Sequence, residues 1–387
     1  MKRNKFCAIL SLDEVDDDLQ PLTNERPIAA LPFDCRYRLI DFPLSSIANA
    51  GIDTVAMFLA GSGRSIYDHI RSGREWDLDT LHGGVFTFSQ MDLKDKFNKD
   101  SNGKNDYYNN YIDFLKKSKS EFVVVMGSRM LCNLDLNSVL QHHVHKDSQI
   151  TVVYKNVKAG HLHPENDHVL IITEKGDVSS ILKAGQNHTQ KEKEALSMEI
   201  YLLRTTILID ILQDANDRGQ TDHVSVLLHQ SISQFSTHAF EYTGYLSNIG
   251  SVKSYYDANM GMLEEKNFNS LFHGNQKIYT KVKNEVPSFY SKESNVKKSQ
   301  VATGCYIEGN VEQSLLFRHV TIGHGAFIKD SIIMQGGRIG PGADLEYVIL
   351  DKGVVIGPNV VLKGTLENPL VIKKGQKIFN QEGVITL

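Results

Sequence analysis

Carboxylate side chains crowd the segment that follows the first apolar run of the chain. The continuous apolar run Cys7–Leu12 is typical of a buried strand. Five acidic residues come directly after it, namely Asp13, Glu14, Asp16, Asp17 and Asp18. Like charges at contact distance repel by a few kcal/mol even at an effective dielectric near ~20. We therefore expect this segment to disfavour the binding of a phosphate-bearing ligand.

Two other segments carry residue types that bind anions or metals. Gly61-Ser62-Gly63-Arg64 precedes a helix-like stretch, so it either binds an anion at a helix N-terminus or is an ordinary loop with a surface arginine. His142, His143 and His145 lie on a predicted helix, but they lack the i, i+4 spacing of helical metal ligands. We predict that these histidines form a solvated face and that the chain has no metal site.

Composition excludes several classes of function. The chain has 387 residues, 41% of them hydrophobic and 23% charged, and a net charge of −4, so no global positive field recruits nucleic acid. No apolar stretch reaches the length of a membrane span. The four cysteines are far apart and form no C-x-x-C pair. We expect reduced thiols in a cytoplasmic protein that contacts neither nucleic acid nor membrane.

The first 250 residues alternate strand-like and helix-like segments. This pattern predicts a Rossmann-like α/β domain with a mostly parallel sheet over residues 1–250. The other apolar runs interpreted as buried strands are Thr54–Leu59, Phe122–Met126, Ile150–Tyr154, Val169–Thr173 and Glu199–Leu203. Amphipathic stretches predict helices at Asn137–Lys146 and Thr206–Ala215, and Ser251–Lys266 predicts a connecting helix within a linker over residues 251–299.

A repeat replaces the helical pattern in the last part of the chain. Segments of the form Ile-Gly-x-x-(Ala/Val) begin at Ile322, Ile339 and Ile356, which are 17 residues apart. Aliphatic residues followed by Gly at a fixed interval predict a β-helix of the hexapeptide type over residues 300–387. An α/β domain followed by a short β-helix is typical of sugar nucleotidyltransferases.

Several long motifs resemble those of the ADP-glucose pyrophosphorylase family. Leu31–Ser46 is similar to the family signature P-F-G-G-K-Y-R-L-I-D-F-x-L-S-N, and Gly244–Met260 is similar to G-Y-W-x-D-V-G-T-I-D-A-Y-W-E-A-N. Ser314–Phe317, Asp330–Met334 and Val348–Gly353 resemble S-V-L-F, D-S-V-I-M and V-I-D-K-G. The resemblance covers nearly the whole chain, and it implies that the β-helix is left-handed.

The resemblance also implies a reaction, the transfer of an adenylyl group from ATP to glucose-1-phosphate. That reaction needs a Gly-rich phosphate loop, flanking cations and two carboxylates for Mg²⁺. Against the loop motif A-G-G-x-G-x-R-L-x-P-L-T, Asp13, Glu14 and Asp16 replace the glycines and Asp18 replaces the catalytic arginine.

Other positions that the family uses for catalysis have changed as well. Ile28 replaces the lysine of R-A-K-P, and Ala184 replaces the lysine of E-F-V-E-K-P. Ser128 and Lys253 stand where the family has its two magnesium carboxylates. We therefore expect no catalytic residues, no bound cofactor and no Mg²⁺ site.

The retained framework and the lost site together imply a regulatory, non-catalytic subunit. The resemblance implies a heterotetramer with a catalytic paralogue in glycogen biosynthesis. It also implies a small anionic effector at Arg36, which takes the place of an effector-contacting lysine, and we hypothesise that Arg64 contributes to the same pocket. Two alternatives stay open at this point. One is an active glucose-1-phosphate adenylyltransferase with an atypical site, and the other is a hexapeptide acyltransferase-like protein.

Overall fold

The structure is a computed structural model that describes residues 6–14, 17–59, 61, 63–81, 83–89, 106–164, 166–186, 192–274 and 276–379. The described residues form two compact units that interleave along the sequence. We call residues up to 15, 40–246 and 275–279 the α/β unit, and residues 16–39, 247–274 and 280–387 the β-helix unit.

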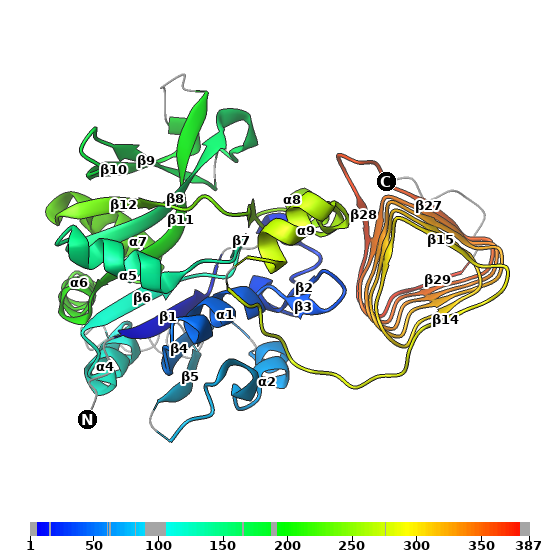
Figure 1. Ribbon diagram of the computed structural model, residues 1–387, viewed down its shortest axis with the longest axis horizontal. Helices are drawn as coiled ribbons and strands as arrows, with labels where there is room; N and C mark the ends of the chain where they lie inside the picture. The colour runs from blue at the N-terminus through cyan, green and yellow to red at the C-terminus, as the bar shows by residue number, and fades with distance from the viewer. Residues whose placement is uncertain are drawn as a thin grey trace. The chain divides into compact units, whose positions relative to one another are not determined.

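A nine-stranded sheet forms the centre of the α/β unit (Figure 1). Its strands are β1 (Phe6–Leu12), β4 (Thr54–Leu59), β5 (Gly84–Ser89), β6 (Phe122–Met126), β8 (Ile150–Lys158), β9 (His168–Ile172), β10 (Val178–Lys183), β11 (Lys193–Arg204) and β12 (Thr237–Glu241). Strands β5, β4, β1 and β6 are parallel neighbours, and β12 is parallel to β8. The long strand β11 runs antiparallel to β6, β8 and β9.

Helices cover both faces of this sheet. They are α1 (Asp41–Asn49), α2 (Arg64–Ile70), α4 (Asn109–Ser118), α5 (Leu136–His145), α6 (Thr205–Asp217) and α7 (Val224–Ser231). Alternate residues of β1 and β6, including Ile9 and Val125, pack with α4, α6 and α7 in one apolar core. Helix α5 contacts β8 and β11 but contributes nothing to that core, so it covers the opposite face. The side chain of Asp135 caps the first turn of α5.

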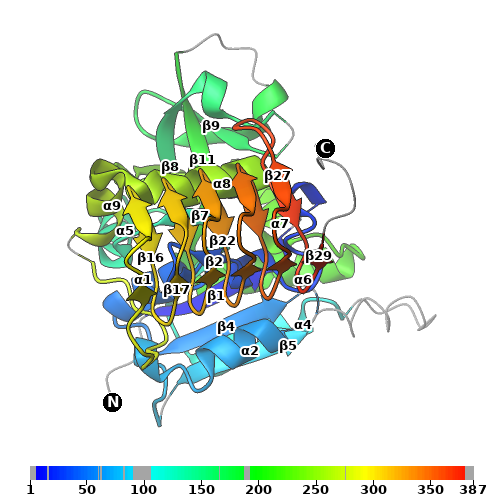
Figure 2. The same cartoon turned by 90° about the vertical axis from the view of Figure 1, so that its right-hand side faces the viewer.

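The β-helix unit contains three parallel sheets that form the sides of a coil (Figures 1 and 2). Its strands are β14 (Phe289–Tyr290), β15 (Asn295–Lys297), β16 (Gln300–Val301), β17 (Tyr306–Ile307), β18 (Asn310–Glu312), β19 (Leu315–Leu316), β20 (Thr321–Ile322), β21 (Phe327–Lys329), β22 (Ile332–Ile333), β23 (Arg338–Ile339), β24 (Asp344–Glu346), β25 (Val348–Leu350), β26 (Val355–Ile356), β27 (Val361–Lys363), β28 (Leu370–Ile372) and β29 (Lys377–Ile378). This is the left-handed β-helix that the sequence predicted.

The pairing register of the coils explains the sequence repeat. Ile307, Ile322, Ile339 and Ile356 pair in order along one sheet and are all buried. Each inward position therefore stacks an aliphatic side chain on its equivalent in the next coil, as repeat proteins do. The coils also require glycine, because a Cβ at Gly323 would lie 2.7 Å from the backbone nitrogen of Pro341.

Shorter elements complete both units. They are β2 (Pro32–Phe33), β3 (Tyr37–Arg38), β7 (Met130–Cys132), β13 (Leu246–Asn248), α8 (Val252–Met260) and α9 (Glu265–Phe272). The predicted connecting helix Ser251–Lys266 is therefore two helices, which a short 3-10 turn at Gly261–Leu263 separates. The capping box of Ser251 with Ser254 fixes the start of α8.

The histidines of α5 differ from the sequence prediction. His143 is buried, its Nδ1 lies 2.8 Å from the hydroxyl oxygen of Thr151, and its ring packs edge-on against Phe122. Burial lowers the pKa of His143 to about 4, so this side chain is a neutral core residue and not part of a solvated face. His145, two residues later, is exposed.

All four cysteines lie within the described part of the chain, and each is buried as a free thiol. Within the same residues, no helix combines the length and the apolar character that a membrane crossing requires.

Candidate functional site

The parallel strands β1 and β6 end side by side in the α/β unit. Leu10 of β1 pairs with Met126 of β6, so the residues after both strands emerge at one edge of the sheet. Ligands of open α/β sheets bind at the carboxyl ends of such strands. The residues that come together there are Asp13 and Glu14 after β1, and Gly127, Ser128 and Arg129 after β6.

The side chain of Glu14 fills the turn that follows β6. Its carboxylate accepts hydrogen bonds from the backbone nitrogen of Ser128 at 2.7 Å, from the hydroxyl of Ser128 at 2.5 Å and from the backbone nitrogen of Arg129 at 2.9 Å. It also lies against Gly127, where a Cβ would sit 2.3 Å from Glu14 Oε1. Burial raises the pKa of Glu14, and the hydrogen bonds from Ser128 and Arg129 oppose that shift. The polar groups of this turn are thus satisfied by a side chain of the protein itself.

Asp13 pairs with a histidine from a distant helix. Its carboxylate lies 3.0 Å from Nε2 of His223, and the Asp13 side chain is nearly buried. Nδ1 of His223 accepts from the backbone nitrogen of Ser225 at the start of α7, so this ring nitrogen takes part in the helix cap. Although burial acts to lower the pKa of His223, the Asp13 carboxylate raises it above its ordinary value. Asp13 is therefore held in an ion pair and does not face open solvent.

Arg129 extends the ion-pair network toward β9. Its guanidinium lies 3.2 Å from the carboxylate of Asp167 and donates to the carbonyl oxygen of Asn166 at the same distance. Asp167 is buried and also accepts from the backbone nitrogen of His163 at 2.8 Å. Among the described residues, this edge of the sheet thus holds acidic and basic side chains that pair with one another.

The remaining loop positions belong to the other unit or lie outside the described residues. Asp18 is exposed on a 3-10 turn at Asp17–Leu19 of the β-helix unit, and Ile28 is buried in a second turn of that unit, Ile28–Ala30. Asp16 lies outside the described residues. Of the acidic residues that the structure describes, Asp13 and Glu14 each have their own partner within the α/β unit.

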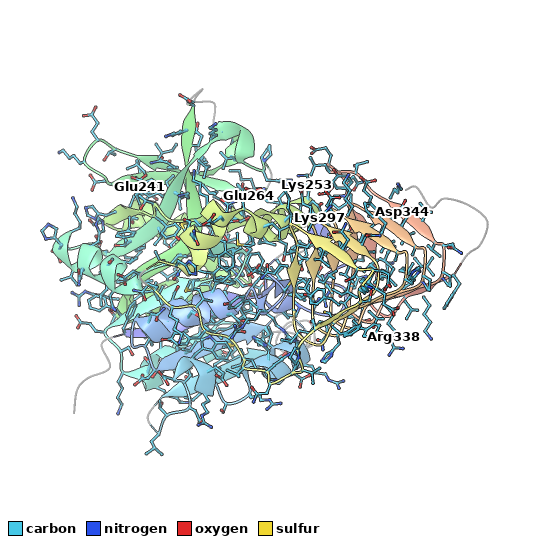
Figure 3. All side chains as sticks on the ribbon, turned by 45° about the vertical axis from the view of Figure 1, so that its right-hand side comes forward. Glu241, Lys253, Glu264, Lys297, Arg338 and Asp344 are labelled. Carbon is cyan, nitrogen blue, oxygen red and sulfur yellow. The ribbon has the colours of Figure 1, made fainter. Side chains whose placement is uncertain are left out.

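The positions of the expected metal and sugar-phosphate ligands carry other contacts. Ser128 donates to Glu14, as described above. Lys253, labelled on α8 of the β-helix unit (Figure 3), forms an ion pair of 2.5 Å with Asp257 one turn later. Ala184 begins a short turn after β10, and its backbone nitrogen donates to the carbonyl of Asp167.

The two predicted effector residues lie in different units. Arg36 is exposed in the β-helix unit, beside the ring of Tyr37. Arg64 is exposed at the start of α2 in the α/β unit. Sequence reasoning missed a stronger concentration of positive charge within the β-helix unit, formed by Arg38, Lys283 and Lys352.

Charge repulsion marks this basic cluster. Burial and then the charges of Arg38 and Arg26 lower the pKa of Lys352 to about 7. Burial and the neighbouring arginines also lower the pKa of Lys283 to about 8. Arg26 is already paired with the carboxylate of Asp351 at 2.7 Å. A cluster of this kind favours an anion, because an anion would stabilise the charged form of each lysine.

Sequence signals for these contacts were weak. The partners of the acidic loop come from separate stretches of the chain, namely His223, Arg129 and Asp167. They have no fixed spacing to the loop, and the topology of the sheet brings them to one edge. The basic cluster likewise joins residues from β3, from the segment before β14 and from the turn after β25.

Comparisons with known proteins agree with this architecture. A nucleotidyl transferase family model matches residues 17–265, and a GlmU-like C-terminal hexapeptide model matches residues 285–367. A glycogen biosynthesis protein GlgD from Bacillus subtilis (strain 168) is 34% identical over 375 residues, which are 97% of this chain and 97% of that protein. A GlgD protein from Geobacillus stearothermophilus is 37% identical over 375 residues, 96% of this chain and 97% of the relative. A glucose-1-phosphate adenylyltransferase from Geobacillus stearothermophilus is 30% identical over 333 residues, 84% of each chain.

Proposed function

Since the chain belongs to the nucleotidyl transferase family and, within it, to the group of the GlgD glycogen biosynthesis proteins, we propose that it is a non-catalytic subunit of glycogen biosynthesis. In this proposal it regulates a catalytic glucose-1-phosphate adenylyltransferase and forms a heterotetramer with it. Its buried free thiols suit a reducing cytoplasm.

The observation that carries the proposal is the position of Glu14. Backbone N–H groups at the carboxyl ends of parallel strands normally bind the phosphates of a ligand. Here two of them, from Ser128 and Arg129, already donate to an internal carboxylate. A triphosphate would have to displace that carboxylate and approach its negative charge, which is unfavourable on both counts.

The metal requirement supports the same conclusion. Adenylyl transfer needs carboxylate oxygens to hold Mg²⁺ on the reacting phosphates. The two expected positions are Ser128, whose hydroxyl donates to Glu14, and Lys253, whose ammonium is paired with Asp257. Neither side chain offers an oxygen anion to a cation.

A subunit without its own turnover acts through coupling to its partner. Typical coupling free energies are about 1–3 kcal/mol, which correspond to roughly 5- to 150-fold changes in affinity. The test is a titration of this protein into the purified catalytic relative, with ADP-glucose formation and mass by light scattering as readouts. We expect no turnover by this chain alone, and a mixed oligomer with altered apparent affinity or rate.

The possible outcomes separate the candidate functions. Efficient turnover by the isolated chain would favour the adenylyltransferase with an atypical site, an activity that one relative carries in its name. Two species that migrate separately, with unchanged kinetics of the catalytic relative, would refute the regulatory proposal. Acyl transfer from an acyl-CoA by the isolated chain would instead favour an acyltransferase.

We also propose that an anionic effector binds the β-helix unit near the basic cluster of Arg38, Lys283 and Lys352, with Arg36 on the same unit. The probe is sulfate, because its charge does not change near neutral pH. Sulfate should raise the Tm of the wild type more than chloride does at equal ionic strength, and Lys352→Met should reduce that gain. The matched control is Lys297→Met, which removes an exposed lysine of the same unit (labelled in Figure 3). An equal sulfate effect in Lys352→Met and Lys297→Met would exclude the cluster as the site.

A further inference from the structure

Two histidines and one glutamate converge in the α/β unit, and none of them was a candidate site residue in the sequence analysis. They are His168 on β9, Glu199 on β11 and His229 on α7. One ligand atom from each lies within 4.8 Å of the other two. Nδ1 of His168 is 3.2 Å from the Glu199 carboxylate, and the imidazole centroids of His168 and His229 are 4.5 Å apart. Three potential ligands on three separate elements therefore face a common point.

The backbone of Glu199 is unusual for a glutamate. Its φ is +53°, in the left-handed region that favours glycine, and it lies where the pairing of β11 with β8 shifts register between Ser197 and Ile200. A β-bulge of this kind re-aims a side chain, here toward the two histidines. Backbone strain of this type persists where the surroundings fix it, and it concentrates at functional sites.

The side-chain types suit a metal cation. A carboxylate and neutral imidazoles are the forms that metals bind. Nε2 of His229 is also buried without a hydrogen-bond partner among the described residues.

Two positively charged side chains near the cluster are paired with other carboxylates. Arg129 acts on Glu199, but its guanidinium is paired with Asp167. His223 acts on His229, and it is paired with Asp13. Arg129 and His223 therefore each have a carboxylate of their own, so neither needs Glu199 as its partner.

We propose that His168, Glu199 and His229 bind one divalent transition-metal ion, with Zn²⁺ as the best match. Two imidazoles and one carboxylate form a ligand set that zinc accepts, with a fourth position for water or another ligand. Metal–ligand bonds of about 2.0–2.2 Å place neighbouring ligand atoms roughly 3.4 Å apart around a tetrahedral ion. The present separations between ligand atoms do not exceed 4.8 Å, so small changes of side-chain rotamer would bring them to that value. Mg²⁺ is a poor match because it prefers oxygen ligands.

This site is distinct from the magnesium positions of the family, because Ser128 and Lys253 contribute nothing to it. It also does not depend on the proposed regulatory function, since a metal can bind whether or not the chain has a partner. A structural role, in which His168 and Glu199 simply form an ion pair, is the alternative that an experiment has to separate.

The experiment uses the full chain, stripped of metal with a chelator and then titrated with Zn²⁺ against a chromophoric competitor. Co²⁺ serves as a second probe, because its visible absorption reports coordination by nitrogen ligands. We expect one Zn²⁺ per chain, a Tm that rises with Zn²⁺, and a visible Co²⁺ spectrum. The variants His168→Ala and His229→Ala should weaken Zn²⁺ binding at least about tenfold, the range seen when metal sites are disturbed.

Glu199→Gly separates binding from folding. Glycine adopts the positive φ without strain, so this variant should fold at least as well as one that keeps a side chain there, yet it should lose the metal. The matched controls are His145→Ala and His324→Ala, which remove exposed histidines outside the cluster. A wild type that binds no Zn²⁺, or cluster variants that bind it as tightly as the two controls, would overturn the proposal.

Discussion

Replacement of Glu14 by alanine tests the central feature of the candidate site. The substitution leaves two backbone N–H groups and the Ser128 hydroxyl without the carboxylate that now accepts from them. Hydrogen bonds to charged groups contribute about 1.5–3 kcal/mol each. The three donors share one carboxylate, so their contributions do not simply add. Glu14 is only partly buried, so water can accept some of the hydrogen bonds that the alanine variant lacks. We expect a decrease of about 2–4 kcal/mol in the free energy of unfolding.

The assay is thermal unfolding of the full chain. For a domain of this size, that loss corresponds to a decrease in Tm of about 5–10 °C. Ser128→Ala removes only the hydroxyl donor, so it should lower the Tm less than Glu14→Ala does. Glu174→Ala, in the exposed turn between β9 and β10, is the matched control and should leave the Tm unchanged.

A small carboxylate should rescue the alanine variant. Formate can occupy the space that the Glu14 carboxylate leaves and accept from the same N–H groups. We expect formate to recover part of the lost Tm in Glu14→Ala but to leave the wild type unaffected, with chloride at equal ionic strength as reference. If Glu14→Ala has the same Tm as Glu174→Ala and formate does not raise it, the carboxylate does not fill the turn. The argument against phosphate binding then fails.

Four further predictions concern the two units. The double variant Ser128→Asp/Lys253→Asp restores the family's metal carboxylates but keeps Glu14, so it should still form no ADP-glucose, and efficient turnover would contradict this. Leu345→Ala opens a cavity in the stack between Ile328 and Leu362 and should destabilise the β-helix unit by about 2–5 kcal/mol, whereas Arg338→Ala on its exposed surface (Figure 3) should not change the Tm. The gain in Tm from sulfate should be larger at pH 6 than at pH 8.5, because Lys352 and Lys283, with pKa values of about 7 and about 8, are largely charged at pH 6 and largely neutral at pH 8.5. Without an anion the dependence has the opposite sign. The folded pKa of Lys352 lies below that of the unfolded chain, so stability should rise with pH between about 7 and 10.5.

Local patterns in the sequence determined most of the architecture. The apolar runs gave Thr54–Leu59 and Phe122–Met126 with the bounds that the structure has. The repeat at Ile322, Ile339 and Ile356 predicted the β-helix, because each coil places an equivalent residue in the same stack. These features depend on periods of a few residues or of one coil, and a single sequence displays such periods directly.

Contacts between distant segments were decided only by the tertiary structure. The residue order predicted an acidic loop that disfavours phosphate. It could not show that Glu14 accepts a hydrogen bond from Ser128 or that Asp13 pairs with His223. The sequence also placed His143 on a solvated face, whereas the packing of α5 against the sheet buries it.

The reason lies in what fixes a side chain in space. The order of strands in the sheet brings the ends of β1 and β6 together, although more than a hundred residues separate them in the chain. The β-bulge at Glu199 then turns one carboxylate toward His168 and His229, and no spacing in the sequence encodes that meeting. The sequence showed which residue types differ from the family motifs, whereas the strand order decided which side chains contact one another at those positions.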